Sequence, residues 1–349
     1  MKEKLLELFE QNRGTLISGS DIAKSLGVSR AAVNKAISGL RDSGYKFDAT
    51  SRLGYVFSEK NDIISPSGIY KYLNGNKHKI VHLDEVNSTN TALKELAQNG
   101  AQEGTVVVTE MQTGGKGRRG KRFFSPRGCG VYFSLLLRPR LKAADSVFIT
   151  VAASVAVRRA IKLLLHADTQ IKWVNDVYFN NKKLCGILTE ASMEIESGYL
   201  NYAVLGIGIN IKPPENGYPE EFAFKTTNLS EISHPLPDDL KNKLIAEVLT
   251  QFDRLYETLE QKDYIEEYKE ASCILNRKIA YGTKNMVKEP AMTKEQAVQA
   301  IETGIEMVET LKAKGYGIIA TGEMGIGNTT TSSAVASVIL KRPVEEMTG

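Results

Sequence analysis

The chain has 349 residues, 42% of them hydrophobic and 25% charged, a composition that excludes a disordered protein and leaves room for two or three hydrophobic cores. Its formal net charge of +4 permits nucleic-acid binding without establishing it. The three cysteines lie far apart and the four histidines form no cluster, which excludes a Cys/His metal site and agrees with a reducing compartment. Because the longest apolar run, 147–157, is too short to span a bilayer, we expect a cytoplasmic protein without a membrane partner.

The first sixty residues predict three helices followed by a pair of strands. The second helix ends at Gly27, and a capping serine at 29 begins a third helix over 30–41. Such a helix-turn-helix places polar residues of its third helix against bases and phosphates, and strands over 45–57 would form a wing. A packing module without DNA is the alternative, but the helix spacing together with the wing favours DNA binding. The residues expected on DNA are Ser29, Arg30, Asn34, Lys35 and Arg52.

Alternating strands and helices are predicted for about two hundred residues after a Ser-Pro-Ser break at 65–67. This alternation favours a mixed sheet with helices on one face. The strand-like segments are 105–110, 130–137, 171–179, 183–193 and 201–211, and the longest helix covers 147–165.

A glycine-rich basic segment, 114–127, lies between two of these strands and contains no acidic residue. It is not a nucleoside-triphosphate P-loop, because it lacks that motif's spacing and the Ser or Thr that follows the lysine at the start of a helix. Basic residues packed among glycines favour a backbone that bends around a small anion over a broad nucleic-acid patch. From this segment alone, a solvated surface loop is an equal alternative.

Five segments occur in the order and spacing of one family, and they lie behind the predicted winged helix: 82–90, 112–123, 172–176, 182–187 and 206–210. Together they resemble the bifunctional biotin protein ligases that also repress the biotin operon. The resemblance runs from residue 1 to about residue 284. It implies a DNA-binding domain at 1–60 and a catalytic domain at 65–270.

Members of this family activate biotin with MgATP to give biotinoyl-5′-adenylate, and then pass the biotinoyl group to one lysine of a biotin carboxyl carrier protein. The resemblance therefore implies biotin, ATP and Mg²⁺ as ligands, and the carrier protein and operator DNA as partners. It also implies a homodimer that the adenylate promotes and that places two winged helices on a palindrome.

The resemblance implies that polar residues bind the ureido head of biotin, that the glycine-rich segment folds over its ring and that a lysine lies near its carboxylate. Taken alone, the residues at 88 and 89 also suit a helix cap, and Lys183 also suits an exposed position in a hairpin. Lys172 and Lys182 are alternative candidates for the lysine near the biotin carboxylate. The implied biotin residues are Ser88, Thr89, Asn90, Gln112, Gly115, Lys116, Gly117, Lys183 and Gly186.

The same resemblance assigns the nucleotide to basic and aromatic residues. Positive charge would offset the negative charge that builds on the transferred phosphoryl group, and Phe123 or Phe124 stands where the family carries a ring over the adenine. Asp176 would bind Mg²⁺, which prefers carboxylate and phosphate oxygens. The implied ATP residues are Arg118, Arg119, Lys121, Phe123, Asn175 and Asn210, and the implied catalytic residues are Lys183, Arg118 and Asp176.

The resemblance to the ligases stops before the end of the chain. Segment 271–286 contains the first strand, 273–282, of the small SH3-like barrel that ends these ligases, and the rest of that barrel is missing. Segment 287–349 predicts a helix, a strand at 316–321 and a glycine-rich loop at 322–333 before another helix. It resembles an internal piece of nicotinate-nucleotide:dimethylbenzimidazole phosphoribosyltransferase without that family's catalytic carboxylate. We expect a fused fragment with no activity of its own.

The predicted fold class is α+β, with a winged helix-turn-helix, a central mixed sheet typical of class II synthetase-like ligases, and a helix–strand–helix tail in place of the barrel. The predicted function is an ATP-dependent biotin protein ligase that is also a biotin-responsive repressor. The alternative is a repressor that senses biotinoyl-adenylate with impaired ligase turnover, because the missing barrel normally helps to close over ATP. A third possible function, a phosphoribosyltransferase, is supported only by the tail.

Overall fold

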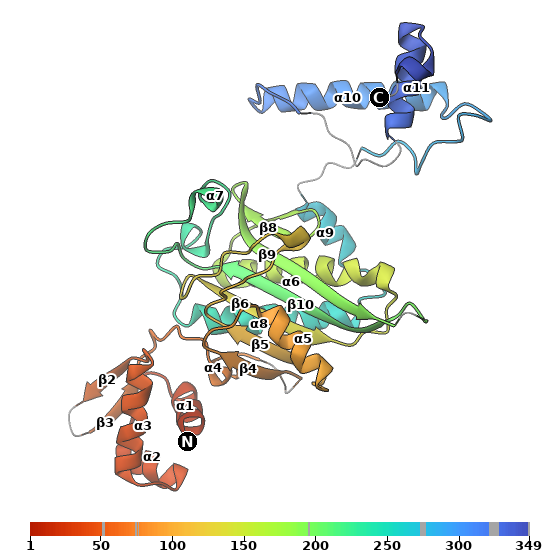
Figure 1. Ribbon diagram of the computed structural model, residues 1–349. Helices are drawn as coiled ribbons and strands as arrows, with labels where there is room; N and C mark the ends of the chain where they lie inside the picture. The colour runs from red at the N-terminus through yellow and green to blue at the C-terminus, as the bar shows by residue number, and fades with distance from the viewer. Residues whose placement is uncertain are drawn as a thin grey trace. The chain divides into compact units, whose positions relative to one another are not determined.

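The computed structural model describes residues 1–50, 53–73, 75, 77–194, 196–272, 277–320 and 328–347. The chain divides into two compact units, Met1–Ile274 and Leu275–Gly349. In the first unit, a small module of helices and short strands precedes a domain built on a broad sheet (Figure 1).

The N-terminal module is held together by local capping and by a small apolar core. Ser18 and Ser29 each accept a hydrogen bond from the backbone N–H three residues on, at 3.1 and 3.2 Å, and so begin α2 and α3. Gly27 ends α2 with a φ of +65°, and Phe9 is fully buried in the core. The predicted helix-turn-helix is confirmed, while Arg52 lies outside the described residues. The elements are α1 (Lys2–Gln11), β1 (Leu16–Ile17), α2 (Gly19–Leu26), α3 (Arg30–Asp42), β2 (Phe47–Thr50) and β3 (Gly54–Phe57).

The second domain is built on seven strands in the order β4-β5-β6-β10-β9-β8-β7. The pair β4 and β5 is parallel and the other neighbours are antiparallel, so the predicted mixed sheet is confirmed. The elements are α4 (Pro66–Tyr70), β4 (Lys79–Leu83), α5 (Thr89–Gln98), β5 (Thr105–Thr109), η1 (Arg118–Gly120), β6 (Gly130–Leu137), η2 (Ala143–Ser146), α6 (Val147–Leu165), β7 (Gln170–Lys172), β8 (Asp176–Phe179), β9 (Lys182–Met193), β10 (Leu200–Asn210), α7 (Glu220–Ala223), η3 (Leu229–Glu231), α8 (Leu240–Glu257) and α9 (Ile265–Ala271).

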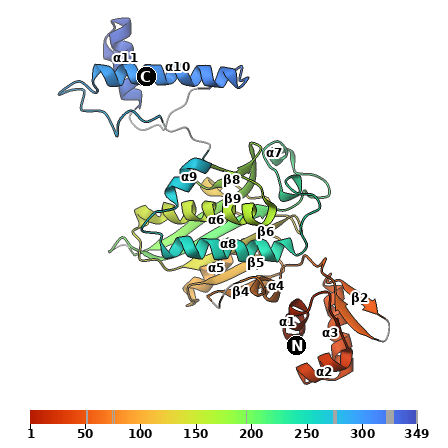
Figure 2. The ribbon, with the colours of Figure 1, turned by 180° about the vertical axis from the view of Figure 1, so that it is seen from behind.

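The two faces of this sheet are covered by different helices. Successive side chains of a strand point to opposite faces of the sheet, so the contacts of β5 show which helices cover each face. Val106 and Val108 pack into the larger core with α6 and α8, whereas Val107 packs with Leu93 of α5. Figures 1 and 2 show α5 on one side of the sheet and α6 and α8 on the other. The expected helical face is therefore present, and α5 adds a helix on the second face.

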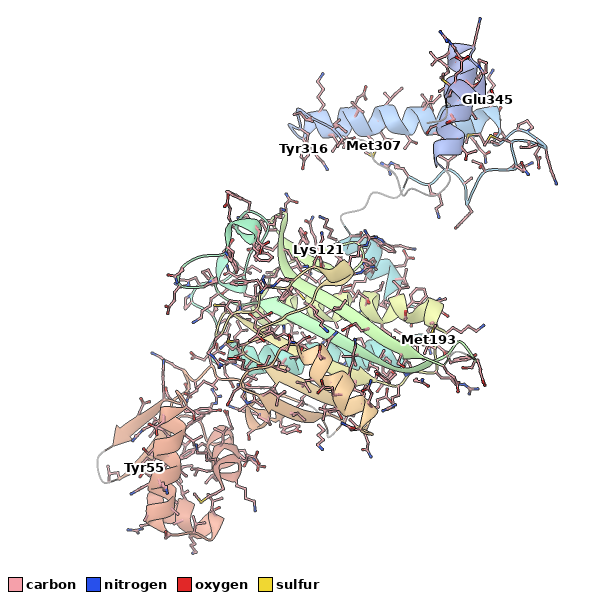
Figure 3. The ribbon with its side chains drawn as sticks, in the orientation of Figure 1. Tyr55, Lys121, Met193, Met307, Tyr316 and Glu345 are labelled. Atoms are coloured by element: carbon pink, nitrogen blue, oxygen red, sulfur yellow. The ribbon has the colours of Figure 1, made fainter. Side chains whose placement is uncertain are left out.

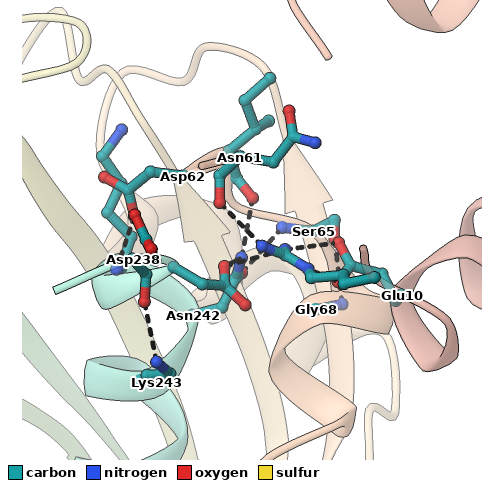
Figure 4. A network of polar contacts seen from close by, with 12 residues as sticks. Glu10, Asn61, Asp62, Ser65, Gly68, Asp238, Asn242 and Lys243 are labelled. Carbon is teal, nitrogen blue, oxygen red and sulfur yellow. Dashed lines mark hydrogen bonds and ion pairs between the residues drawn. The ribbon is translucent and has the colours of Figure 1, made fainter. Parts of the chain in front are cut away.

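A buried polar network joins α1 to α8 (Figure 4). Arg13, whose side chain is 6% exposed, pairs with Glu10 at 2.6 Å and with Asp239 at 3.0 Å. Its guanidinium also donates to the carbonyl oxygen of Asn61 at 2.9 Å, and Asn242 of α8 donates to Asp239 at 2.7 Å. Burial raises the pKa of both Glu10 and Asp239. Because a buried charge is tolerated only when it is paired, the network holds the N-terminal helix against the sheet domain.

The second unit consists of α10 (Lys294–Ala313), α11 (Asn328–Leu340) and the short turn η4 (Val344–Glu346). A capping box begins α10, in which Thr293 and Gln296 exchange side-chain to backbone hydrogen bonds at 3.0 and 3.2 Å. The apolar stripe of α10 is uncovered, since Ile301 and Ile305 are 66% and 55% exposed. The described part of this unit therefore has little core of its own.

Two predicted strands are corrected by the structure. Over 277–282 and 316–320 the described chain has no strand, while 273–276 and 321–327 lie outside the described residues. A strand is stable only where a neighbouring strand receives its backbone hydrogen bonds, and the described residues of the second unit offer no such neighbour. Across the described ranges, every helix lacks the length or the apolar character needed to cross a membrane.

Candidate active site

A partly open cavity lies between the start of α5, the glycine-rich loop before β6, and strands β9 and β10. All of the residues expected to bind biotin line it except Gly115, and Arg118, Phe123 and Asn175 of the expected ATP site join them. The cavity is lined by Ser88, Thr89, Asn90, Gln112, Lys116, Gly117, Arg118, Phe123, Asn175, Lys183, Gly186, Ile187, Leu188, Gly206, Ile207 and Gly208.

Glycines keep this cavity open. A Cβ at Gly208 would lie 2.5 Å from Cε1 of Phe123, and a Cβ at Gly206 would lie 2.1 Å from Oδ1 of Asn90. A Cβ at Gly115 would lie 2.3 Å from the carbonyl oxygen of Phe123, where the loop turns back on itself. Any larger residue would displace these neighbours. Gly206 and Gly208 were not among the expected site residues. Glycine at alternate positions of a strand indicates a strand face without side chains, and here that face lines the cavity.

The start of α5 forms the polar end of the cavity. Thr89 donates its backbone N–H to Gln112 Oε1 at 2.9 Å, and its Oγ1 lies 3.2 Å from the same oxygen. Asn90 Nδ2 donates to Glu190 Oε2 at 2.8 Å, and Ser134 Oγ lies 2.6 Å from Asn90 Oδ1. The sequence patterns did not identify Ser134 or Glu190. A hydroxyl within the apolar strand 130–137 is the signal that could have indicated Ser134.

Contacts between the glycine-rich loop and α5 close one side of the cavity. Lys116 Nζ donates to Thr91 Oγ1 at 2.8 Å, which ties the loop to the first turn of α5. Ser88 occupies the N-cap position of that helix, but its side chain makes no capping hydrogen bond. Ser88 is 2% exposed and lines the cavity, so helix capping does not account for its hydroxyl.

The basic residues of the loop line the cavity and an adjoining groove, and some of them line both. Gly117 N donates to Lys121 O at 2.7 Å, which closes a tight turn through Arg119, whose φ is +55°. Arg118 lines the cavity and donates to Asn175 Oδ1 at 3.3 Å. Arg119 and Lys121 are absent from this lining and line an adjoining groove instead, to which Arg118 also contributes.

An ion pair forms the charged end of the cavity. Lys183 Nζ pairs with Asp176 Oδ1 at 2.8 Å, and Asn175 Nδ2 donates to the same oxygen at 3.0 Å. Lys183 lines the cavity, whereas Lys172 contacts the ring of the tyrosine at 178, and Lys182 is not part of the lining. Among the residues that the structure describes, no group of three or more His, Cys, Asp or Glu could hold a metal ion.

The two aromatic candidates of the loop point to different places. Phe123 lines the cavity, and its ring centroid lies 5.6 Å from Lys183 Nζ. Phe124 stacks instead on Phe222, with ring centroids 5.7 Å apart and an interplanar angle of 17°. Asn210, an expected ATP residue, lies in an adjoining pocket beside Phe123 and Phe222. Phe123 is therefore the ring that contacts the cavity.

Four of the residues expected on DNA lie at the N-cap and in the first half of α3, and the fifth, Arg52, lies outside the described residues. Arg30 and Lys35 are exposed cations, whereas Ser29 caps the helix. Asn34 Oδ1 accepts a hydrogen bond from the hydroxyl of Tyr55, which belongs to β3 of the wing (Figure 3). This contact holds the wing beside α3, and Arg30 and Lys35 are the exposed cations among the expected DNA residues that the structure describes.

Residues 83–210 match the family described as the biotin/lipoate A/B protein ligase family, and residues 2–56 match the family described as the HTH domain. The chain is 38% identical over 260 residues to the bifunctional ligase/repressor BirA of Bacillus subtilis (strain 168), which covers 73% of this chain and 78% of that protein. The chain belongs to the bifunctional ligase/repressor family.

Two further matches of this ligase/repressor have lower sequence identity. The bifunctional ligase/repressor BirA of Escherichia coli (strain K12) is 31% identical over 198 residues, which are 57% of this chain and 60% of that protein. A solved structure of a biotin protein ligase from Aquifex aeolicus in complex with biotin and ATP is 30% identical, covers 56% of this chain and 79% of its own, and superimposes with a TM-score of 0.48.

A second family match covers the end of this ligase/repressor. Residues 256–349 match the family described as phosphoribosyltransferase. Nicotinate-nucleotide–dimethylbenzimidazole phosphoribosyltransferase of Clostridium tetani (strain Massachusetts / E88) is 59% identical over 78 residues, which are 22% of this chain and 22% of that protein. The predicted resemblance of the tail to a fragment of that family is confirmed. The family match begins within α8, earlier than the expected boundary at 287.

Proposed function

We propose that the first unit activates biotin with ATP and transfers the biotinoyl group to a lysine of a biotin carboxyl carrier protein. The observation that carries this proposal is a single cavity with two different ends. Thr89 and Gln112 provide hydrogen-bonding groups at one end, and Lys183 and Arg118 provide positive charge at the other. A neutral ureido ring needs donors and acceptors in fixed positions, whereas a carboxylate and a phosphate need cations.

The charged end suits the activation step. A carboxylate oxygen of biotin attacks the α-phosphorus of ATP, the bond to the leaving pyrophosphate breaks, and biotinoyl-adenylate forms. Lys183 would draw the two anions together, and Arg118 would stabilise the charge on the phosphoryl group and on the pyrophosphate. Before substrates bind, the ion pair with Asp176 at 2.8 Å holds the ammonium group of Lys183 in the cavity.

Mg²⁺ fits this site as an ion that arrives with the nucleotide. Asp176 Oδ1 already accepts from Lys183 at 2.8 Å and from Asn175 at 3.0 Å. Within the described part of the chain, no further carboxylates gather into a ligand cluster. Asp176 would therefore contribute one carboxylate, and phosphate oxygens and water would contribute the other ligands. The ion would offset phosphate charge during activation.

Two assays test this function in sequence. Biotin-dependent exchange of pyrophosphate into ATP measures activation, and incorporation of biotin into a purified carrier protein measures transfer. We expect the full chain to perform both reactions. A chain that shows no biotin-dependent exchange would contradict the proposal.

A second candidate function is a repressor that senses biotinoyl-adenylate and transfers biotin poorly. The observation that favours it is the second unit, whose described residues contain helices and no strand where the ligase resemblance implies a barrel. Such a chain would exchange pyrophosphate and bind operator DNA, and it would transfer little biotin to the carrier protein. The transfer assay therefore separates the two candidates.

A further inference from the structure

The polar end of the cavity contains a hydrogen-bond chain whose first end is fixed by the backbone. Ser125 Oγ donates to Phe123 O at 3.1 Å, so it has no second hydrogen and accepts from Gln112 Nε2 at 2.9 Å. Gln112 Oε1 accepts from the backbone N–H of Thr89 at 2.9 Å. These bonds fix the Gln112 amide with its oxygen toward Thr89.

The other end of the chain is fixed by an acidic residue. Asn90 Nδ2 donates to Glu190 Oε2 at 2.8 Å and to Leu188 O at 3.2 Å, so Asn90 Oδ1 is left to face Ser134 Oγ at 2.6 Å. Glu190 Oε1 also pairs with Lys94. Burial opposes the ionisation of Glu190, but hydrogen bonds from Lys94 and Asn90 outweigh it and lower the pKa of the carboxyl group below its usual value. Glu190 is therefore an acceptor at neutral pH.

Between these two fixed amide oxygens, the contacts outnumber the hydrogens. Ser134 Oγ lies 2.6 Å from Asn90 Oδ1 and 2.7 Å from Thr89 Oγ1, and Thr89 Oγ1 lies 3.2 Å from Gln112 Oε1. Each hydroxyl supplies one hydrogen, so two hydrogens serve three oxygen–oxygen contacts. A ligand that donates an N–H to Thr89 Oγ1 or Gln112 Oε1, whose residues both line the cavity, supplies a hydrogen to the acceptor that this deficit leaves unsatisfied.

We propose that Glu190 is a positioning residue that makes this end of the cavity select ligands with N–H groups. The inference rests on the proposed function, in which the ligand is biotin and its ureido ring carries an N–H on each side of the carbonyl. Glu190 acts through Asn90. If the Asn90 amide turned over, it would donate an N–H to Ser134. Each contact in the hydrogen-bond chain would then have a hydrogen before the ligand binds.

Two substitutions that break the same Lys94–Glu190 ion pair separate this role from a structural one. In Glu190→Gln, Lys94 keeps the amide oxygen, so the new amide N–H faces Asn90 and turns its side chain. In Lys94→Met, the carboxylate still accepts from Asn90. We expect the dissociation constant for biotin, measured by calorimetry on the full chain without ATP, to rise about tenfold in Glu190→Gln and to change less than about threefold in Lys94→Met.

A double variant and two ligand analogues sharpen the test. In Lys94→Met/Glu190→Gln no cation holds the amide oxygen, so that oxygen can turn to Asn90, and tight biotin binding should return. The analogues are the two cyclic carbamates in which one ureido N–H of biotin is replaced by oxygen. The unsubstituted chain should prefer biotin to at least one of them, and Glu190→Gln should narrow this preference.

The outcomes distinguish the two levels of the proposal. Equal weakening of biotin binding in the two single variants, or no recovery in the double variant, would overturn the positioning role and leave the proposed function in place. A chain that binds no biotin would overturn the proposed function and the positioning role together. Similar melting temperatures for the single variants, with different affinities for biotin, would support the proposal.

Discussion

Lys183 and Asp176 pair at 2.8 Å inside the cavity, with side chains that are 29% and 20% exposed. A partly exposed ion pair of this kind contributes about 1 kcal/mol or less to folding, because water screens the attraction and two side chains lose freedom. The same ammonium group in a cavity for anions contributes much more to a reaction in which negative charge develops. Its effects on stability and on catalysis should therefore separate.

Replacing Lys183 with alanine should reduce biotin-dependent pyrophosphate exchange by about a hundredfold, because one cation at the reacting phosphoryl group is lost. The free energy of unfolding should change by about 1 kcal/mol or less. Both quantities can be measured on one preparation, by exchange and by urea unfolding. Lys172→Ala is the matched control, since Lys172 lies outside the cavity, and it should change neither. A loss of stability that accounts for the loss of activity would show that Lys183 is structural.

The contact between α1 and α8 depends on buried charge. Arg13 pairs with Glu10 at 2.6 Å and with Asp239 at 3.0 Å, and these side chains are almost fully buried. Arg13→Ala should lower the free energy of unfolding by about 3–5 kcal/mol at neutral pH, because two carboxylates lose their cation and remain away from water. Urea unfolding checks this value. Arg254→Ala, an exposed arginine on α8, should have little effect.

The destabilisation caused by Arg13→Ala should also depend on pH, and its direction follows from the pKa shifts. Burial raises the pKa of Glu10 above 4.5 and the pKa of Asp239 above 3.8, and the loss of Arg13 removes a charge that lowers both. Over the window between these ordinary values and the raised ones, the folded chain holds more protons than the unfolded chain, so stability falls as pH rises. The destabilisation by Arg13→Ala should therefore be smaller at pH 5 than at pH 7.5. A destabilisation that does not depend on pH would mean that the carboxyl groups are not the source of the effect.

For the chain as a whole, the binding of biotin and ATP should be coupled to the binding of DNA. Arg30 and Lys35 are the exposed cations at the start of α3, and one module with so few phosphate contacts binds weakly and in a salt-dependent way. We propose that biotin with ATP promotes a homodimer that places two such modules on a palindromic operator. Gel-shift affinity should rise when both ligands are added.

Arg30→Ala/Lys35→Ala is the control for that prediction. This variant should lose DNA affinity with or without ligand and should keep pyrophosphate exchange, because both residues lie outside the cavity. Sedimentation should show dimers only with both ligands. An affinity for DNA that ligand leaves unchanged would remove the sensor role.

The tail should not contribute an activity. It spans 22% of its phosphoribosyltransferase relative, and Ile301 and Ile305 of α10 are 66% and 55% exposed. Deleting 289–349 should leave adenylation within a few-fold of the full chain, because the cavity residues all lie before 210. Neither protein should form a benzimidazole riboside phosphate from nicotinate mononucleotide. Formation of that product by the full chain would show that the tail is a working domain.

Features that depend on neighbours in the sequence were predictable. The caps at Ser18 and Ser29 and the turn at Gly27 use hydrogen bonds that span three or four residues, so the sequence indicated the helix-turn-helix. The segments that line the cavity were also found, because their glycine and polar spacing is typical of one family. The strands expected at 273–282 and 316–321 are absent over their described parts, 277–282 and 316–320, because local apolar patterning does not supply a neighbouring strand.

Only the tertiary structure decided how distant residues meet. Asn90 and Glu190 are 100 residues apart, and their hydrogen bond exists because α5 packs across β5, β6 and β10 so that the Asn90 side chain reaches β9. The choice of Lys183 over its neighbour Lys182 depends on the pairing of β8 with β9, which is irregular between residues 177 and 178. A shift of one residue in a strand turns every side chain to the other face of the sheet. Composition and motif spacing therefore indicate which segments form the site, and strand register determines which of their side chains enter it.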